Sequence, residues 1–152
     1  MGHLTLYRAD MTPSAWETER FSSGLGRLPD AREPRTHRVV NGDWSFTMLY
    51  PLNGMNALEI VQDRLICAEG QLYRINGIQK EDVGAGRRLR VDAEHIFYDL
   101  RNSEILNIET AENPDTENGV TQEEALGLIL ADTPFTVGTV NTGSGLNHLD
   151  IL

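Results

Sequence analysis

The sequence has little cysteine and no long apolar run. Cys67 is the only cysteine among 152 residues, which excludes an intramolecular disulfide and a thiolate metal cluster. Its neighbours Leu65, Ile66 and Ala68 predict a small buried side chain rather than a reactive thiol. No stretch approaches the about 18 apolar residues of a membrane span, so we expect none. The N-terminus lacks the basic-then-apolar profile of a signal peptide, so we expect synthesis in a cytoplasm.

Cations are scarce in the second part of the chain. Residues 1–90 hold 12 Lys and Arg against 11 Asp and Glu, whereas residues 91–152 hold 1 against 12. The two parts therefore carry +1 and −11, which sum to the net charge of −10. An acidic surface repels phosphate backbones, so we expect no sequence-specific binding of nucleic acid. The acidity instead predicts a solvated or partner-facing surface.

Aromatic side chains are concentrated in one predicted hairpin. Asn41-Gly42 favours a tight turn, because both residues tolerate a positive φ. Residues 36–40 would pair with the strand that follows, and Pro51 would end that strand because it lacks an N–H. Alternation places four side chains on one face of the strand, which predicts a sheet core: Trp44, Phe46, Met48 and Tyr50.

Further short strands follow from local patterns, and the 14 glycines suit a β-rich fold with many turns. We predict a strand at residues 4–7, a loop at 11–19 and apolar runs at 58–61 and 64–68. Residues 72–80 and 87–92 should pair around a loop at 81–86, with Gly77 as a bulge. A change of period at residues 93–100 then predicts a short helix near 94–100, built on Ile96, Phe97 and Leu100.

The C-terminal third carries one clear helix signal. Thr121 and Glu124 have capping-box spacing, which predicts a helix near 121–132. We further expect a strand at 104–110, a polar loop at 111–119 and a final strand at 135–140. The local patterns therefore predict an α+β fold that is rich in β-strands.

Few residues suggest chemistry. His95 and Asp99 have the i, i+4 spacing of two metal ligands, but a structural role for His95 is favoured because no second histidine lies nearby. Gly24-Leu25-Gly26 is a weak phosphate-loop pattern, and a tight turn is favoured. No nucleophile elbow occurs, while paired carboxylates for glycoside hydrolysis stay open as an alternative. We therefore assign no catalytic, cofactor-binding or metal residue, expect no cofactor, and predict that the chain is not an enzyme.

Several segments are more specific together than any one of them alone. They are Phe21-Ser22-Ser23-Gly24-Leu25-Gly26-Arg27-Leu28-Pro29-Asp30-Ala31, Asn41-Gly42-Asp43-Trp44-Ser45-Phe46, Tyr50-Pro51, Leu72-Tyr73-Arg74-Ile75, Val91-Asp92-Ala93-Glu94-His95-Ile96-Phe97-Tyr98-Asp99-Leu100, residues 121–130 and Thr133-Pro134-Phe135. Over roughly residues 4–140, their order and spacing resemble the N-terminal region of phage tail-associated proteins, a family also called prophage tail endopeptidases. The departures are mild, with Phe46 at a commonly aliphatic position and Phe97 at a commonly small or polar one.

The resemblance implies a baseplate-hub module of a phage or prophage-derived tail tip. Its expected architecture is an antiparallel β-barrel-like hub domain at 1–100, followed by the start of a second α+β hub domain at 101–152. Such a module forms a homotrimeric ring beneath the distal tail protein, contacts other tail-tip and tail-tube proteins, and lets DNA pass. It belongs to the virion, and any hydrolase activity of the family lies in C-terminal domains beyond this stretch. Two alternatives stay open: a cell-wall (peptidoglycan) hydrolase of the tail tip, and a glycan-binding β-barrel.

Overall fold

The computed structural model describes residues 3–11, 13–40, 42–84 and 86–102, together with positions 126, 127, 129, 130, 135 and 137. The chain divides into two units, Met1–Asp99 and Leu100–Leu152. The fold described below is that of the first unit. The expected division into domains at residues 100 and 101 stays a prediction.

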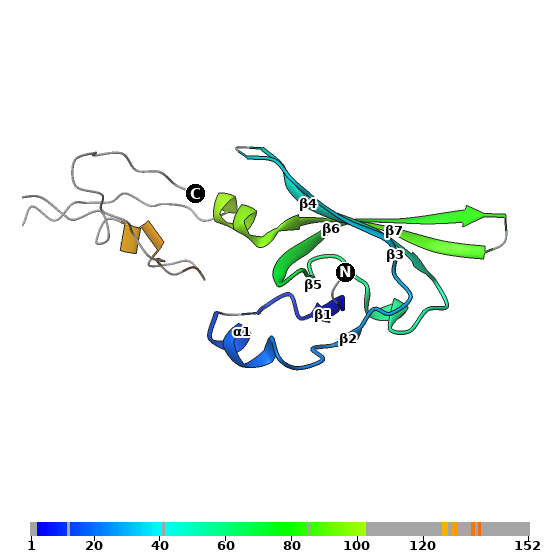
Figure 1. Ribbon diagram of the computed structural model, residues 1–152, viewed down its shortest axis with the longest axis horizontal. Helices are drawn as coiled ribbons and strands as arrows, with labels where there is room; N and C mark the ends of the chain where they lie inside the picture. The colour runs from blue at the N-terminus through cyan, green and yellow to red at the C-terminus, as the bar shows by residue number, and fades with distance from the viewer. Residues whose placement is uncertain are drawn as a thin grey trace, which may run out of the picture. The chain divides into compact units, whose positions relative to one another are not determined.

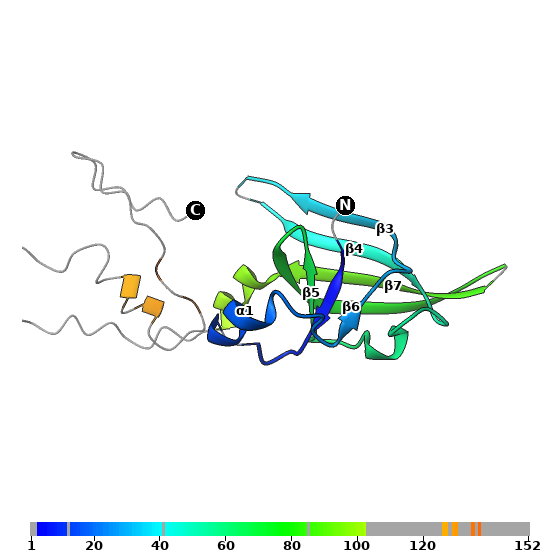
Figure 2. The same cartoon turned by 60° about the horizontal axis from the view of Figure 1, so that its bottom comes forward.

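One antiparallel sheet of seven strands forms the first unit, in the order β2-β1-β5-β6-β7-β4-β3. The sheet curls into a half-barrel (Figures 1 and 2), which confirms the predicted β-rich, barrel-like fold. Its strands are β1 (Thr5–Tyr7), β2 (Gly26–Arg27), β3 (Arg32–Arg38), β4 (Trp44–Pro51), β5 (Leu65–Ala68), β6 (Gln71–Val83) and β7 (Gly86–His95). Three short helices accompany them: α1 (Pro13–Glu19) and the 3₁₀ helices η1 (Ala57–Glu59) and η2 (Ile96–Asn102).

The aromatic hairpin forms as β3 and β4. Phe46, Met48 and Tyr50 alternate with half-buried residues along β4 and are buried, as the period-2 pattern predicts. The connection differs from the predicted two-residue turn. The Val39 N–H donates to the Asp43 carbonyl at 2.9 Å, and the Gly42 N–H donates to the Val39 carbonyl at 3.0 Å. The last register pair is Arg38 with Trp44 and the last bond between the two sides joins Val39 to Asp43, whereas the prediction paired the strands through residue 40.

The longest hairpin joins β6 to β7. A register shift between Ile75 and Gly77 confirms the predicted bulge. The turn is tighter than the predicted loop at 81–86, because Val83 already pairs with Gly86. Gly84 has a φ of +33°, a conformation that a residue without a Cβ adopts readily, and this allows so short a turn.

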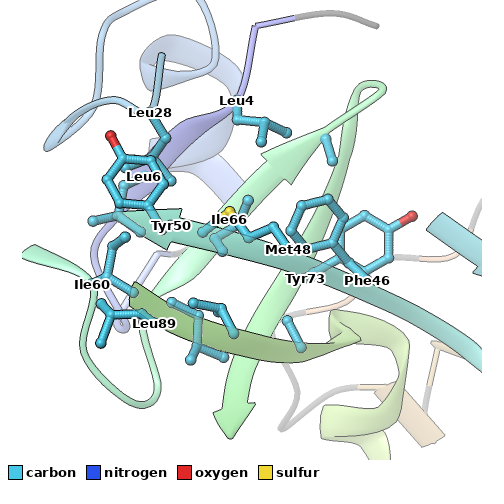
Figure 3. Close-up of a cluster of buried hydrophobic side chains, with 14 of the residues drawn as sticks. Leu4, Leu6, Leu28, Phe46, Met48, Tyr50, Ile60, Ile66, Tyr73 and Leu89 are labelled. Atoms are coloured by element: carbon cyan, nitrogen blue, oxygen red, sulfur yellow. The ribbon is translucent and has the colours of Figure 1, made fainter. Parts of the chain in front are cut away.

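The core fills the concave side of the curled sheet. Figure 3 shows side chains from β1, β4, β5, β6 and β7 converging there with the connecting segments. The labelled members are Leu4, Leu6, Leu28, Phe46, Met48, Tyr50, Ile60, Ile66, Tyr73 and Leu89. A second, smaller cluster of Tyr7, Leu65 and Leu72 packs against Trp16 of α1. Apolar burial on both faces of β1 and β5 explains why β1 is buried along its whole length.

The helices required two corrections. Residues 13–19 form α1, whereas the sequence suggested a loop; Pro13 suits the first helical position, where its missing N–H has no partner. The Trp16 ring meets Tyr7 edge-on at 5.3 Å, so tertiary packing supports this short helix. The helix predicted near residues 94–100 begins at Ile96 and is η2, because β7 continues to His95. Residues 126, 127, 129 and 130 are helical, and the rest of the predicted helix and its cap lie outside the described residues.

Candidate functional site

His95 is held at the end of β7 by an aromatic stack. Its ring lies parallel to the Trp44 indole, with centroids 3.6 Å apart and an interplanar angle of 6°. Nδ1 accepts the Phe97 N–H at 3.1 Å, which places the ring proton on Nε2, 3.0 Å from the Gln71 Oε1 acceptor. Burial, together with the positive charge of the nearby Arg38, lowers the pKa of His95 to about 4. The imidazole is therefore neutral at pH 7, with both nitrogens engaged.

Asp99, the other half of the candidate metal pair, binds an arginine. Its carboxylate receives Arg74 Nε at 2.9 Å and Arg74 Nη2 at 2.7 Å in a forked contact. Within the described ranges, no group of three or more His, Cys, Asp or Glu could hold a metal ion. His95 and Asp99 thus serve two structural contacts, which agrees with the structural role favoured for His95.

The glycine segment before β2 is a tight turn against β1. The Leu25 N–H donates to the Leu6 carbonyl at 2.7 Å, and Gly24 has a φ of +53°. A Cβ at Gly24 would lie 2.3 Å from the Leu6 oxygen, so only glycine fits so close to the strand. Packing against β1 therefore explains this glycine without a phosphate.

Cys67 lies on β5 beside the smaller apolar cluster and is partly buried. Burial raises the pKa of its thiol, which disfavours the nucleophilic thiolate. The side chain therefore packs as a small apolar group, in line with the sequence interpretation.

Arginines line two adjoining hollows on the convex face of β3, β4 and β7. The larger, of about 660 Å³, has apolar walls that include Leu49 and Pro51. The smaller, of about 310 Å³, also contains Glu33 and Glu81. Sequence inspection missed this surface, although Arg88 and Arg90 recur at the strand period of two. The five arginines are Arg32, Arg35, Arg87, Arg88 and Arg90.

Strand β3 is an edge of the sheet and is partly blunted. A register shift falls between Arg32 and Arg35, with Glu33 at a φ of +49° and Pro34 beside it. A bulge and a proline both hinder pairing with a further strand. Val39 bonds to Asp43, just before β4, and bonded residues alternate along an antiparallel pair. The N–H and C=O groups of Thr36 and Arg38 therefore point away from β4, to the open side.

Strand β6 also has an open edge, along the part that extends beyond β5. The last register pair with β5 is Leu65 with Arg74, after which Ile75 bonds to residues 63 and 64. From Gly77 to Val83, the described chain offers β6 only β7 as a partner. Val83 and Gly86 close the turn as a hydrogen-bonded pair, and the bonded positions alternate from there along β6. The N–H and C=O groups of Ile78, Lys80 and Asp82 therefore have no main-chain partner among the described residues.

Several large apolar side chains are exposed outside the core. Val40, at the tip of the β3–β4 hairpin, is 88% exposed and Val39 beside it is 47% exposed. The connection from β4 to β5 presents a second group, in which Leu58 is 89% and Met55 61% exposed. Exposed apolar side chains next to unpaired strand edges are typical of interaction surfaces.

The comparisons with known proteins add no relative. No family model, no curated protein and no solved structure matches the chain. Within the part that the structure describes, no helix is long and apolar enough to cross a membrane. The function of the chain is therefore inferred from its residues and from the geometry of its sheet.

Proposed function

We propose that this chain is a structural assembly module, the N-terminal hub domain of a phage or prophage-derived tail tip. In this role three copies form a ring beneath the distal tail protein and close the end of the tail tube. The chain acts in the virion by binding its neighbours and performs no catalysis.

One observation carries the proposal: the curled sheet has open strand edges on both of its long hairpins. An unpaired edge offers main-chain donors and acceptors that another chain can complete without sequence-specific chemistry. The exposed Val39 and Val40 lie beside the open part of β3, where an incoming strand would cover them. Burial of such apolar side chains at the centre of an interface stabilises assemblies.

The residues nominated for chemistry support a binding role. His95 stacks on Trp44 and Asp99 is forked to Arg74, so each side chain already has a structural task. The net charge of −10 disfavours retention of DNA, which suits a ring through which DNA passes.

The experiment is sedimentation of the purified chain over a concentration series, alone and with a phage distal tail protein. We expect a concentration-dependent trimer, and a larger complex when the distal tail protein is added. A monomer at high concentration that binds neither distal tail nor tail-tube protein would contradict the proposal.

A cell-wall zymogram separates the assembly role from the alternative of a peptidoglycan hydrolase. We expect no clearing by the wild-type chain. Clearing that disappears in the variant His95→Ala would replace the structural role with a hydrolase role.

A further inference from the structure

We infer that the β3–β4 hairpin of one copy adds to the open edge of β6 in the next copy, so that the sheet continues from subunit to subunit. This inference rests on the proposed assembly role and specifies its interface. The occupant of the β6 edge is thus the β3 strand of a second copy, including its exposed tip at Val39 and Val40.

The β6 edge is the longer of the two open edges. Ile78, Lys80 and Asp82 each direct an N–H and a C=O group away from β7, over a stretch without proline. Solvent-exposed edges of this length are usually blunted by prolines or bulges, as β3 is near Pro34. The bulge at Gly77 lies where β6 leaves β5, so it does not interrupt the free stretch.

The β3 edge is open only beyond its bulge. Thr36 and Arg38 are the positions whose main-chain groups point outward. A short open window next to a blunted one restricts pairing to a single region of β3. Restriction of this kind favours one register over others.

The positions of the two hairpins determine the symmetry of the contact between copies. The β3–β4 tip adjoins the end of β7 near Glu94, whereas the β6–β7 tip adjoins the end of β4, where Pro51 pairs with Arg88. The two hairpins therefore project from opposite ends of the sheet (Figure 1). Contact between two different surfaces is heterologous, so it repeats from copy to copy and closes into a ring when the rotation allows. A ring of three is the closed form expected from the proposed function.

Charge and main-chain geometry select the register between β3 of one copy and β6 of the next. In antiparallel pairing, Arg38 opposite Asp82 joins two positions with free main-chain groups and opposite charge. The exposed Val40 lies in the turn that follows β3, so the same register brings this turn toward the aliphatic stem of Lys80. Among the described residues, Asp82 makes one ion pair, with Arg87 at 3.1 Å. The Asp82 side chain is 80% exposed and the Arg87 side chain 76%, so Asp82 is available to a second cation.

A charge exchange tests this register in the full chain. We expect Arg38→Asp and Asp82→Arg each to weaken self-association about tenfold, because each places like charges opposite one another. The double variant carries the exchanged pair and should regain the wild-type association. Regain would also show that the loss in Arg38→Asp does not come from its contact with the Trp44 ring. Arg27→Asp and Asp10→Arg are the matched controls, because they make the same charge changes at exposed positions that belong to neither the β3 edge nor the β6 edge.

A proline substitution tests the main-chain contact independently of charge. Lys80→Pro removes an N–H that faces the open edge and spares the bonds between β6 and β7. We expect loss of the trimer in sedimentation, with thermal unfolding close to wild type. Gln79→Pro is the matched control for fold damage, because its N–H faces β7 and its loss should lower the melting temperature.

The outcomes separate the interface from the function. Self-association unchanged in Lys80→Pro and in both single charge variants would overturn this interface and leave the assembly role standing. The interface would also be wrong if the double charge variant stayed dissociated. A wild-type chain that is monomeric and binds no tail protein would overturn both. Assembly lost in Lys80→Pro and regained in the double charge variant would support the interface.

Discussion

The two long hairpins of the sheet are anchored in different ways. The β3–β4 hairpin is anchored by side chains from other elements: Trp44 Nε1 donates to the Tyr73 hydroxyl at 3.1 Å, and the Tyr98 hydroxyl bridges the Trp44 N–H and the Gly42 carbonyl. The distal β6–β7 hairpin is anchored mainly by its own cross-strand ion pairs, Arg88 with Glu81 and Arg87 with Asp82. One hairpin thus depends on tertiary contacts and the other on local ones.

This difference bears on how each hairpin could serve an interface. Aromatic stacking fixes the start of β4 directly after the turn, so the exposed tip is presented in a defined position. Exposed ion pairs contribute little stability, so the distal β6–β7 hairpin can adjust as a partner strand is added. The pairing inferred above therefore joins a fixed strand to an adaptable edge.

The largest effect is expected at the aromatic anchor. Trp44→Ala should lower the free energy of unfolding by about 3 kcal/mol, since it removes the stack with His95 and the hydrogen bond to Tyr73. Urea unfolding followed by circular dichroism measures the change. Trp44→Phe, which keeps a ring but loses the hydrogen bond, should cost about 1 kcal/mol. Equal losses in the two variants would contradict the assigned role of the stack.

A smaller effect should appear when His95 is protonated. The pKa of His95 is about 4 in the fold and about 6.5 in an unfolded chain, so between these values only the unfolded chain takes up the proton. The stabilisation from neutral His95 is complete above about pH 6.5 and declines as the pH falls toward 4, with a loss of about 2 kcal/mol at about pH 5.

Unfolding in urea at several pH values measures this slope. His95→Asn provides the control, because asparagine can also accept an N–H two residues on but does not titrate. The difference between wild type and His95→Asn isolates the histidine from the carboxylates that titrate nearby. Parallel curves for the two proteins would refute the assignment.

The smallest effect should occur in the β6–β7 hairpin. Glu81→Gln removes a partly buried ion pair with Arg88, at 2.8 Å, and should cost about 0.5 to 1 kcal/mol. Asp82→Asn removes an exposed pair and should leave the unfolding midpoint unchanged. Thermal unfolding of the two variants side by side measures the contrast. A loss at Glu81 as large as that at Trp44 would remove the proposed difference between the hairpins.

Much of the sheet could be predicted from local patterns. The alternation along β4, the strand at β1 and the bulge at Gly77 follow from side-chain period and from the missing Cβ. The helix α1 could not be predicted in the same way. Its seven residues carry a weak helical pattern, and Trp16 is stabilised by Tyr7 from a strand that pairs elsewhere.

The candidate site illustrates the same limit. His95 and Asp99 have the spacing of ligands on a helix, but β7 extends through His95, so the helical geometry starts one residue too late. The arginine-lined hollows and the open β6 edge join β3, β4, β6 and β7, whose neighbours are set by register across the sheet. No spacing within one segment encodes that arrangement.

The sequence by itself determined a β-rich, acidic chain with an alternating aromatic strand, because period and composition act within a few residues. Only the tertiary structure decided which strand edges stay unpaired and which side chains hold each hairpin in place. Strand order depends on contacts between residues far apart in the chain, such as Trp44 with His95 and Tyr73. Those contacts form when the sheet curls, so they also determine which strand edges stay open.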